Sequence, residues 1–366
     1  MQASDTPTTA VPPPPLAAPW PVVPPGPERP RQRPRLLQFA IFIAAVSWYF
    51  CVRALAESAS NGLRLRFDLE DVQPVMEALF ELFLVVLGLA LLRAIERRRA
   101  PLRMTLGLPR RATSRAEWAT GAAIGWGLAV ASVLPMALAR TLNVRLWATP
   151  RAFELLGLSL ITLAVATLAR DMGLHGYAFQ RLIDAIGPVR ATIAMALLSA
   201  VYTGFNPAAS GAAIAISVAM SVLVSLCWLR THAIWLLWGL RFAWAASTAV
   251  LFGLPVAGNA AYSTVFETRA VGPHWLTGGG YGPAAALLSG VILLGGIAVL
   301  VRATDDYAWD YTHPPIIPAG YDVTILPPAA HVAMEKAAKA APVSPASLVQ
   351  ILPAAPQIPG VPTSPE

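Results

Sequence analysis

The chain has 366 residues, of which 56% are apolar and 13% are charged, and its net charge is +7. Soluble domains are about 45–50% apolar and about 25% charged, so this composition indicates lipid as the main solvent. Twelve of the 34 prolines lie in residues 1–35 and twelve in residues 313–366, on either side of an apolar middle. This pattern excludes a single soluble enzyme domain, a disulfide scaffold and a fibrous protein.

The Pro-rich ends are predicted to be disordered tails, residues 1–35 at the N-terminus and residues 303–366 at the C-terminus. Segments rich in Pro, Ala and Ser bury too little apolar surface to offset the loss of chain entropy on folding. Residues 36–302 are therefore expected to form the folded domain.

Apolar runs of about 20 residues are long enough to cross a bilayer as helices. The runs of this kind are approximately 36–56, 74–95, 117–139, 153–169, 190–205, 211–229, 233–252 and 283–301. They predict an all-α fold, a polytopic membrane bundle of about eight transmembrane helices. The first run also resembles a signal peptide, because Ala54-Leu55-Ala56 has the form of a cleavage site. Its length and the adjacent Arg53 favour an uncleaved anchor.

The arginines predict the orientation of the bundle. Residues 29–35 contain four and residues 93–115 contain eight, against three in residues 140–151. Cytoplasmic loops carry the excess of positive charge, so we expect a multi-pass protein of the cell membrane with both termini in the cytoplasm. Since these arginines flank apolar runs and form no single basic stripe, the expected partner is the lipid bilayer and no nucleic acid.

Few ionisable residues lie inside the apolar runs, where each costs about 2.5–3.5 kcal/mol on insertion scales. Glu77 and Glu81 lie near the start of the second run, where a helix dipole stabilises carboxylates. Arg241 lies in the middle of the seventh run. Because a guanidinium stays charged in proteins, Arg241 must meet an anion, a group of carbonyls or water.

A second group of polar residues is expected where the fourth run ends, at Arg170 and Asp171. If residues 170–177 are α-helical, Asp171 and His175 share one face, because residues four apart are neighbours. This pair alone is no metal site, since catalytic zinc usually has three protein ligands.

Three segments carry a resemblance to a known family. They are Arg-Asp-Met-Gly-Leu-His-Gly-Tyr at 170–177, Tyr-Thr-Gly-Phe-Asn at 202–206 and Arg-Phe-Ala-Trp-Ala at 241–245. Their order and surroundings resemble the EExxxR, FxxxH and HxxxN motifs of the CAAX protease and bacteriocin-processing (Abi) family of intramembrane endopeptidases. The resemblance covers about residues 153–283, and it implies a helical scaffold whose acidic and His residues bind a metal or activate water.

The motif residues themselves are replaced. The motif positions hold Arg170, Asp171, His175, Tyr202, Asn206, Arg241 and Ala245. Asp171 is the one retained acid, and neither motif His is kept in place. Metal ligands are neutral or deprotonated donors, whereas Arg241 carries a fixed positive charge. The resemblance therefore implies an inactive pseudoprotease without a cofactor, which binds a peptide, a lipidated chain or a membrane partner in the former substrate cavity.

Two alternatives remain open. In the first, the protein is an active endopeptidase with a non-standard site formed by Asp171, His175 and Asn206, together with Glu77 or Glu81. Zinc or another divalent metal then belongs to that site. A transporter is the third alternative, although the sequence shows no inverted repeat and few polar groups in its runs. For the pseudoprotease we expect a salt bridge between Arg241 and Asp171 in place of the metal.

Overall fold

A computed structural model describes residues 34–96 and 101–304, together with residues 333 and 336. The helices belong to one compact unit that begins at Arg35. The two tails predicted from the Pro-rich ends lie almost wholly outside the described residues.

Most of the described chain is helical, which confirms the predicted class. The helices are α1 (Arg35–Phe67), α2 (Gln73–Ile95), α3 (Leu102–Thr105), α4 (Ser114–Leu138), α5 (Pro150–Asp171), α6 (Phe179–Ile186), α7 (Pro188–Gly204), α8 (Gly211–Thr231), α9 (Trp235–Ala246), α10 (His274–Thr277) and α11 (Leu287–Ala303). Two π-helical segments continue α5 and α9, namely η1 (Met172–Ala178) and η2 (Ser247–Leu251). Two 3₁₀ turns precede α11, η3 (Gly279–Tyr281) and η4 (Pro283–Ala285).

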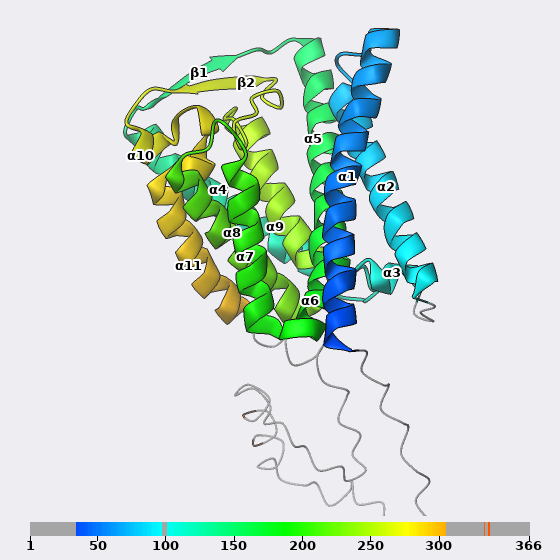
Figure 1. The fold of residues 1–366 in the computed structure, drawn as a ribbon. Coiled ribbons are helices and arrows are strands. Elements are labelled where there is room, and N and C mark those ends of the chain that lie inside the picture. The colour runs from blue at the N-terminus through cyan, green and yellow to red at the C-terminus, as the bar shows by residue number, and fades with distance from the viewer. Residues whose placement is uncertain (1–33, 97–100, 305–332, 334–335, 337–366) are drawn as a thin grey trace, which may run out of the picture. The chain divides into compact units, whose positions relative to one another are not determined.

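A small antiparallel sheet connects two segments that lie between the expected membrane spans. Strand β1 (Leu142–Leu146) pairs with β2 (Phe266–Ala270), with Leu142 opposite Ala270. Each strand has only five residues, and their pairing joins positions more than 100 residues apart in the chain. The sheet lies at one end of the helices (Figure 1).

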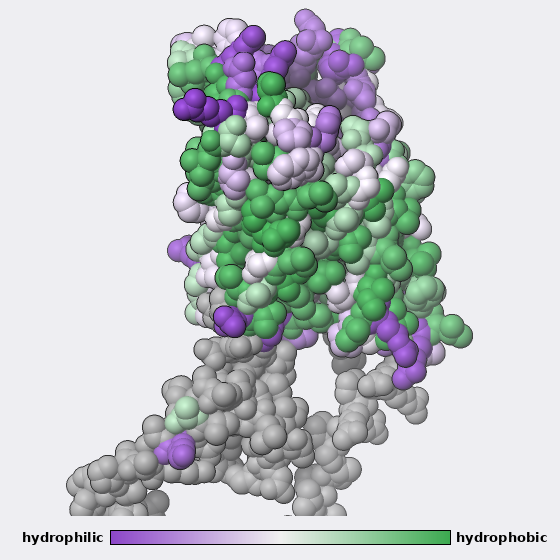
Figure 2. Space-filling model, turned by 90° about the vertical axis from the view of Figure 1, so that its left-hand side faces the viewer, coloured by the Kyte–Doolittle hydropathy of each residue, from purple (hydrophilic) through white to green (hydrophobic). Residues whose placement is uncertain are grey.

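The long helices run alternately towards and away from this sheet (Figure 1). Five helical stretches in the described residues are long and apolar enough to cross a membrane, namely Arg35–Phe67, Gln73–Ile95, Ser114–Leu138, Pro150–Ile186 and Gly211–Thr231. The other three expected spans correspond to shorter helices, α7 and α11 with 17 residues each and α9 with its π-helical extension η2. Figure 2 shows an apolar band between hydrophilic ends on the face that it presents.

Two helices extend beyond their predicted ends. Helix α1 continues to Phe67, so Ala54-Leu55-Ala56 lies inside a helix of 33 residues. The prediction that the fourth span ends at residue 169 is wrong, because α5 continues through η1 and α6 to Ile186. The run ends at Gly187, whose φ of 86° suits glycine and which precedes a proline.

Glycines bring α4 and α9 into close contact. A methyl group on Gly121 would overlap the carbonyl oxygen of Leu236, and one on Gly125 would overlap that of Leu240. Small residues four positions apart let two helix backbones approach closely in a membrane. This contact sets the position of α9 and of Arg241, which follows Leu240 directly.

The segment around Gly107 connects the start of α9 to η1. The carbonyl of Gly107 accepts a hydrogen bond of 2.9 Å from the backbone N–H of Ile234. On its other side, a methyl group on Gly176 of η1 would overlap the carbonyl oxygen of Leu106. The loop before α4 thus holds together the two helical segments that carry the first and third motif positions.

Candidate functional site: a charged cavity within the helices

A cavity of about 750 Å³ lies among α1, α2, α5, α7, α8 and α9, with the chain between η2 and α11 at one end. Five of the seven motif positions line it, namely Arg170, Tyr202, Asn206, Arg241 and Ala245. His175 lines a smaller cavity of about 20 Å³, whose wall also includes Arg170, Tyr202 and Arg241. The other two positions, Asp171 and His175, are buried behind the large cavity. The structure therefore brings the three sequence segments to one place.

The Arg241–Asp171 contact predicted from the sequence is confirmed. Nη1 of Arg241 donates a hydrogen bond of 2.6 Å to Oδ1 of Asp171, and the carboxylate has no exposed surface. The second carboxylate oxygen, Oδ2, has no hydrogen-bond partner among the described residues. The pair joins α9 to the end of α5. Asp171 is thus the anion that the buried charge of Arg241 needs.

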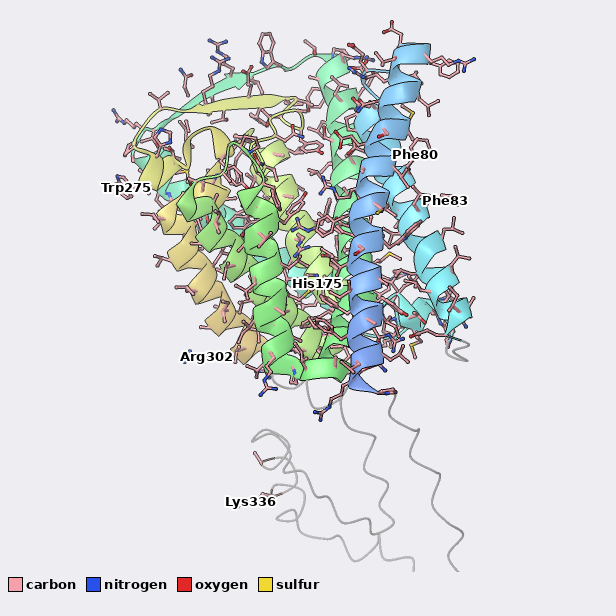
Figure 3. The ribbon with its side chains drawn as sticks, in the orientation of Figure 1. Phe80, Phe83, His175, Trp275, Arg302 and Lys336 are labelled. Atoms are coloured by element: carbon pink, nitrogen blue, oxygen red, sulfur yellow. The ribbon has the colours of Figure 1, made fainter. Side chains whose placement is uncertain are left out.

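His175 lies in a π-helix. Residues 172–178 have hydrogen bonds five residues apart, so they are not the α-helix that the spacing argument assumed. The imidazole is only 2% exposed, and neither ring nitrogen has a hydrogen-bond partner in the described chain. Its ring lies 5.7 Å from that of Phe179, and Figure 3 shows it inside the helices near their mid-height.

Tyr202 connects two arginines in the cavity wall. The Arg53 guanidinium donates a hydrogen bond to the Tyr202 hydroxyl. The guanidinium carbons of Arg53 and Arg170 lie 5.5 Å and 5.7 Å from the centre of the Tyr202 ring, within the range of cation–π attraction. The sequence pattern indicated Arg53 only as a neighbour of the possible cleavage site. Its position inside an apolar run is the signal that identifies it as a cavity residue.

The two carboxylates of α2 face the same cavity. Glu77 and Glu81 both line it, and Glu81 is 7% exposed. The Glu81 side chain interacts with the hydroxyl of Tyr49, which also interacts with Arg53. Because Glu81 lies beyond the first turn of α2, where the effect of a helix dipole fades, the dipole does not account for its burial.

Asn206 holds the loop at one end of the cavity. Its side-chain amide donates a hydrogen bond of 3.2 Å to the carbonyl of Ala257 and accepts one of 3.0 Å from the backbone N–H of Ala208. Two tyrosines of the surrounding loops, Tyr262 and Tyr281, complete this end. Burial raises the pKa of both phenols, and Glu77 raises that of Tyr262 further, so both stay neutral at physiological pH.

The side chains at the motif positions do not fit a metal centre. No group of three or more His, Cys, Asp and Glu residues in the described part of the chain has the proximity that a metal ion requires. The retained acid Asp171 is already paired with Arg241. Comparison of the chain with protein-family models, with curated proteins and with solved structures gave no match.

Proposed function

We propose that this chain is a multi-pass membrane protein on a scaffold like that of the CAAX proteases, and that it acts by binding without catalysis. Its cavity then receives a peptide, a lipidated chain or part of another membrane protein. The observation that carries the proposal is the Arg241–Asp171 ion pair, which joins a motif position in the wall of the cavity, Arg241, to one buried behind it, Asp171.

The pair disfavours hydrolysis for a chemical reason. Water activation at such a site needs a metal hydroxide or a free carboxylate base. Asp171 is neutralised by Arg241, and a fixed guanidinium charge repels a cation at the same place. Of the other five motif positions, Asn206 supports a loop through its amide, and Ala245 has no functional group.

The topology belongs to the same proposal. In this proposal α7, α9–η2 and α11 cross the membrane together with the five longer helical stretches, and the start of α1 and the end of α11 lie at the end opposite the sheet (Figure 1). Helix α3, which contains Arg103, lies at that end too (Figure 1). Under the positive-inside rule this end faces the cytoplasm, with α7, α9–η2 and α11 crossing the membrane although they are short.

The test is metal analysis of the purified full-length protein together with an assay for peptide cleavage. We expect the protein to contain no stoichiometric divalent metal and to cleave no peptide. Asp171→Asn protein that elutes as a single species should give the same metal content and the same absence of cleavage. Stoichiometric zinc together with cleavage that Asp171→Asn abolishes would overturn the proposal.

A second candidate is an active endopeptidase with a non-standard site. It is favoured by one observation, that Glu77 and Glu81 line the same cavity as Asn206. His175, whose ring nitrogens have no hydrogen-bond partner among the described residues, lines the adjoining space. If this candidate is right, Glu81→Gln or His175→Gln abolishes cleavage. Arg151 is exposed and lies outside the cavity, so Arg151→Gln should leave cleavage unchanged.

A further inference from the structure

Four charged side chains face the cavity without forming a direct salt bridge with one another in the described part of the chain. They come from three helices, Arg53 from α1, Glu77 and Glu81 from α2, and Arg170 from α5. Among the described residues, none of the four takes part in a salt bridge, in contrast to Arg241, which is paired with Asp171. Charges inside a protein are usually paired with an opposite charge. Arg53 attracts Glu81 through the cavity, and both side chains interact with Tyr49. Two cations and two anions that line one cavity without a direct ion pair therefore point to a ligand that meets both.

The positive pole of the cavity is built around Tyr202. Arg53 and Arg170 both lie within cation–π range of this one ring, and the tyrosine hydroxyl accepts a hydrogen bond from Arg53. The Tyr202 side chain thus holds two guanidinium groups near each other without neutralising either. A guanidinium is planar and carries several N–H donors, so it binds the oxygens of phosphate or carboxylate groups well.

The negative pole lies on α2. Glu77 and Glu81 are separated by one helical turn and point into the same space. Tyr49 links this pole to the positive one, since its hydroxyl interacts with both Glu81 and Arg53. A primary ammonium group has three N–H donors and suits a site with two carboxylates.

We propose that the cavity binds a small zwitterionic group, with its oxyanion at Arg53 and Arg170 and its primary ammonium at Glu77 and Glu81. The inference rests on the proposed binding role and names the ligand class for it. A cavity of about 750 Å³ is within the usual range for small ligands. The phosphoethanolamine headgroup of a phospholipid presents this chemistry, and so does free glycerophosphoethanolamine.

The experiment measures binding to the delipidated full-length protein in detergent by isothermal titration calorimetry. The probes are short-chain phosphatidylethanolamine, phosphatidylglycerol with the same acyl chains, and glycerophosphoethanolamine. The variants are Arg53→Gln, Arg170→Gln and the double Glu77→Gln/Glu81→Gln. Arg145→Gln, on the exposed strand β1 and outside the cavity, is the matched control.

We expect one phosphatidylethanolamine per chain, bound more tightly than phosphatidylglycerol. Loss of one charge-assisted hydrogen bond weakens binding about tenfold. Arg53→Gln and Arg170→Gln should therefore each raise the dissociation constant about tenfold, and Arg145→Gln should leave it unchanged. The double Glu variant should lose the preference for phosphatidylethanolamine. If glycerophosphoethanolamine binds as tightly as the lipid, the ligand is a soluble zwitterion, and if it does not bind, the ligand is a lipid headgroup.

Equal binding of phosphatidylethanolamine and phosphatidylglycerol, or Arg variants that bind like Arg145→Gln, would overturn the inference. If the Arg variants fail to elute as a single species, the lipid preference of the double Glu variant decides the question. Both results are independent of metal content and peptide cleavage, so failure here is distinguishable from failure of the proposed function.

Discussion

Arg241 of α9 donates a hydrogen bond of 2.6 Å to Asp171 of α5, across 70 positions of the chain, and both side chains are buried. Removing one partner of such a pair leaves an uncompensated charge, whereas removing both does not. The fold therefore depends on each of these two side chains as long as the other is present.

The first prediction concerns this pair. Arg241→Leu and Asp171→Leu should each lower the free energy of unfolding by about 3–5 kcal/mol, and the double variant should lose much less than the sum. Denaturant unfolding in detergent measures these values. The exposed pair of Arg151 and Asp71 is the control, since Arg151→Ala should cost less than about 1 kcal/mol. Additive losses in the double variant would show that the two side chains are not coupled.

The second prediction concerns the contact between α4 and α9. Gly121→Ala places a methyl group against the carbonyl oxygen of Leu236, so it should destabilise the protein by about 1–3 kcal/mol. Gly127 of the same helix has nothing within 4 Å of an added methyl group. Gly127→Ala should therefore be neutral, or stabilising by up to about 1 kcal/mol through helix propensity. Thermal melting of the two variants compares them directly, and equal melting temperatures would contradict the close approach.

The third prediction concerns a second buried ion pair at the end opposite the sheet. Nη2 of Arg181 lies 2.6 Å from Oε2 of Glu96, and Nη1 donates to Gln38 at 3.2 Å, which ties α6 to α1 and to the end of α2. Arg181→Gln should cost about 3–5 kcal/mol of unfolding free energy, while the exposed Arg190→Gln should have little effect.

Arg181 and Glu96 lie outside the cavity, so folded Arg181→Gln protein should bind zwitterions as the unsubstituted protein does. Loss of binding without loss of stability would contradict the separation between the Arg181–Glu96 pair, which stabilises the fold, and the cavity charges, which bind the ligand. Calorimetry and denaturant unfolding on the same preparation provide both values.

The fourth prediction concerns the end of α8. His232 has a φ of 48°, in the left-handed region, and its backbone N–H bonds to the carbonyl of Trp228. A left-handed conformation costs an ordinary residue about 1–2 kcal/mol, and β-branched residues more. His232→Val should lower the melting temperature relative to His232→Gly, and His232→Asn should fall between them. The reverse order would show that the conformation of residue 232 does not limit stability.

The positions of the helices were largely predictable from the sequence. Apolar runs of sufficient length have few alternatives to a helix, so α1, α2, α4 and α8 lie where the runs lie. The partner of Arg241 was also predictable, because a fixed charge in an apolar run needs an anion and the motif order placed Asp171 opposite. The end of α5 was not predictable from the sequence. The polar residues 170 and 171 mark an apparent end, but the helical segment continues past them into η1.

Local sequence alone determined that this chain is a helical, apolar protein with charges at three motif positions. Only the tertiary structure showed that Arg53 and Tyr202, 149 positions apart, are in contact, and that Glu77 and Glu81 face the same cavity as Arg170. The reason is physical. Apolar length and helix propensity act over neighbouring residues, whereas the pairing of charges across a cavity depends on how helices pack, which is set by contacts such as Gly121 against α9.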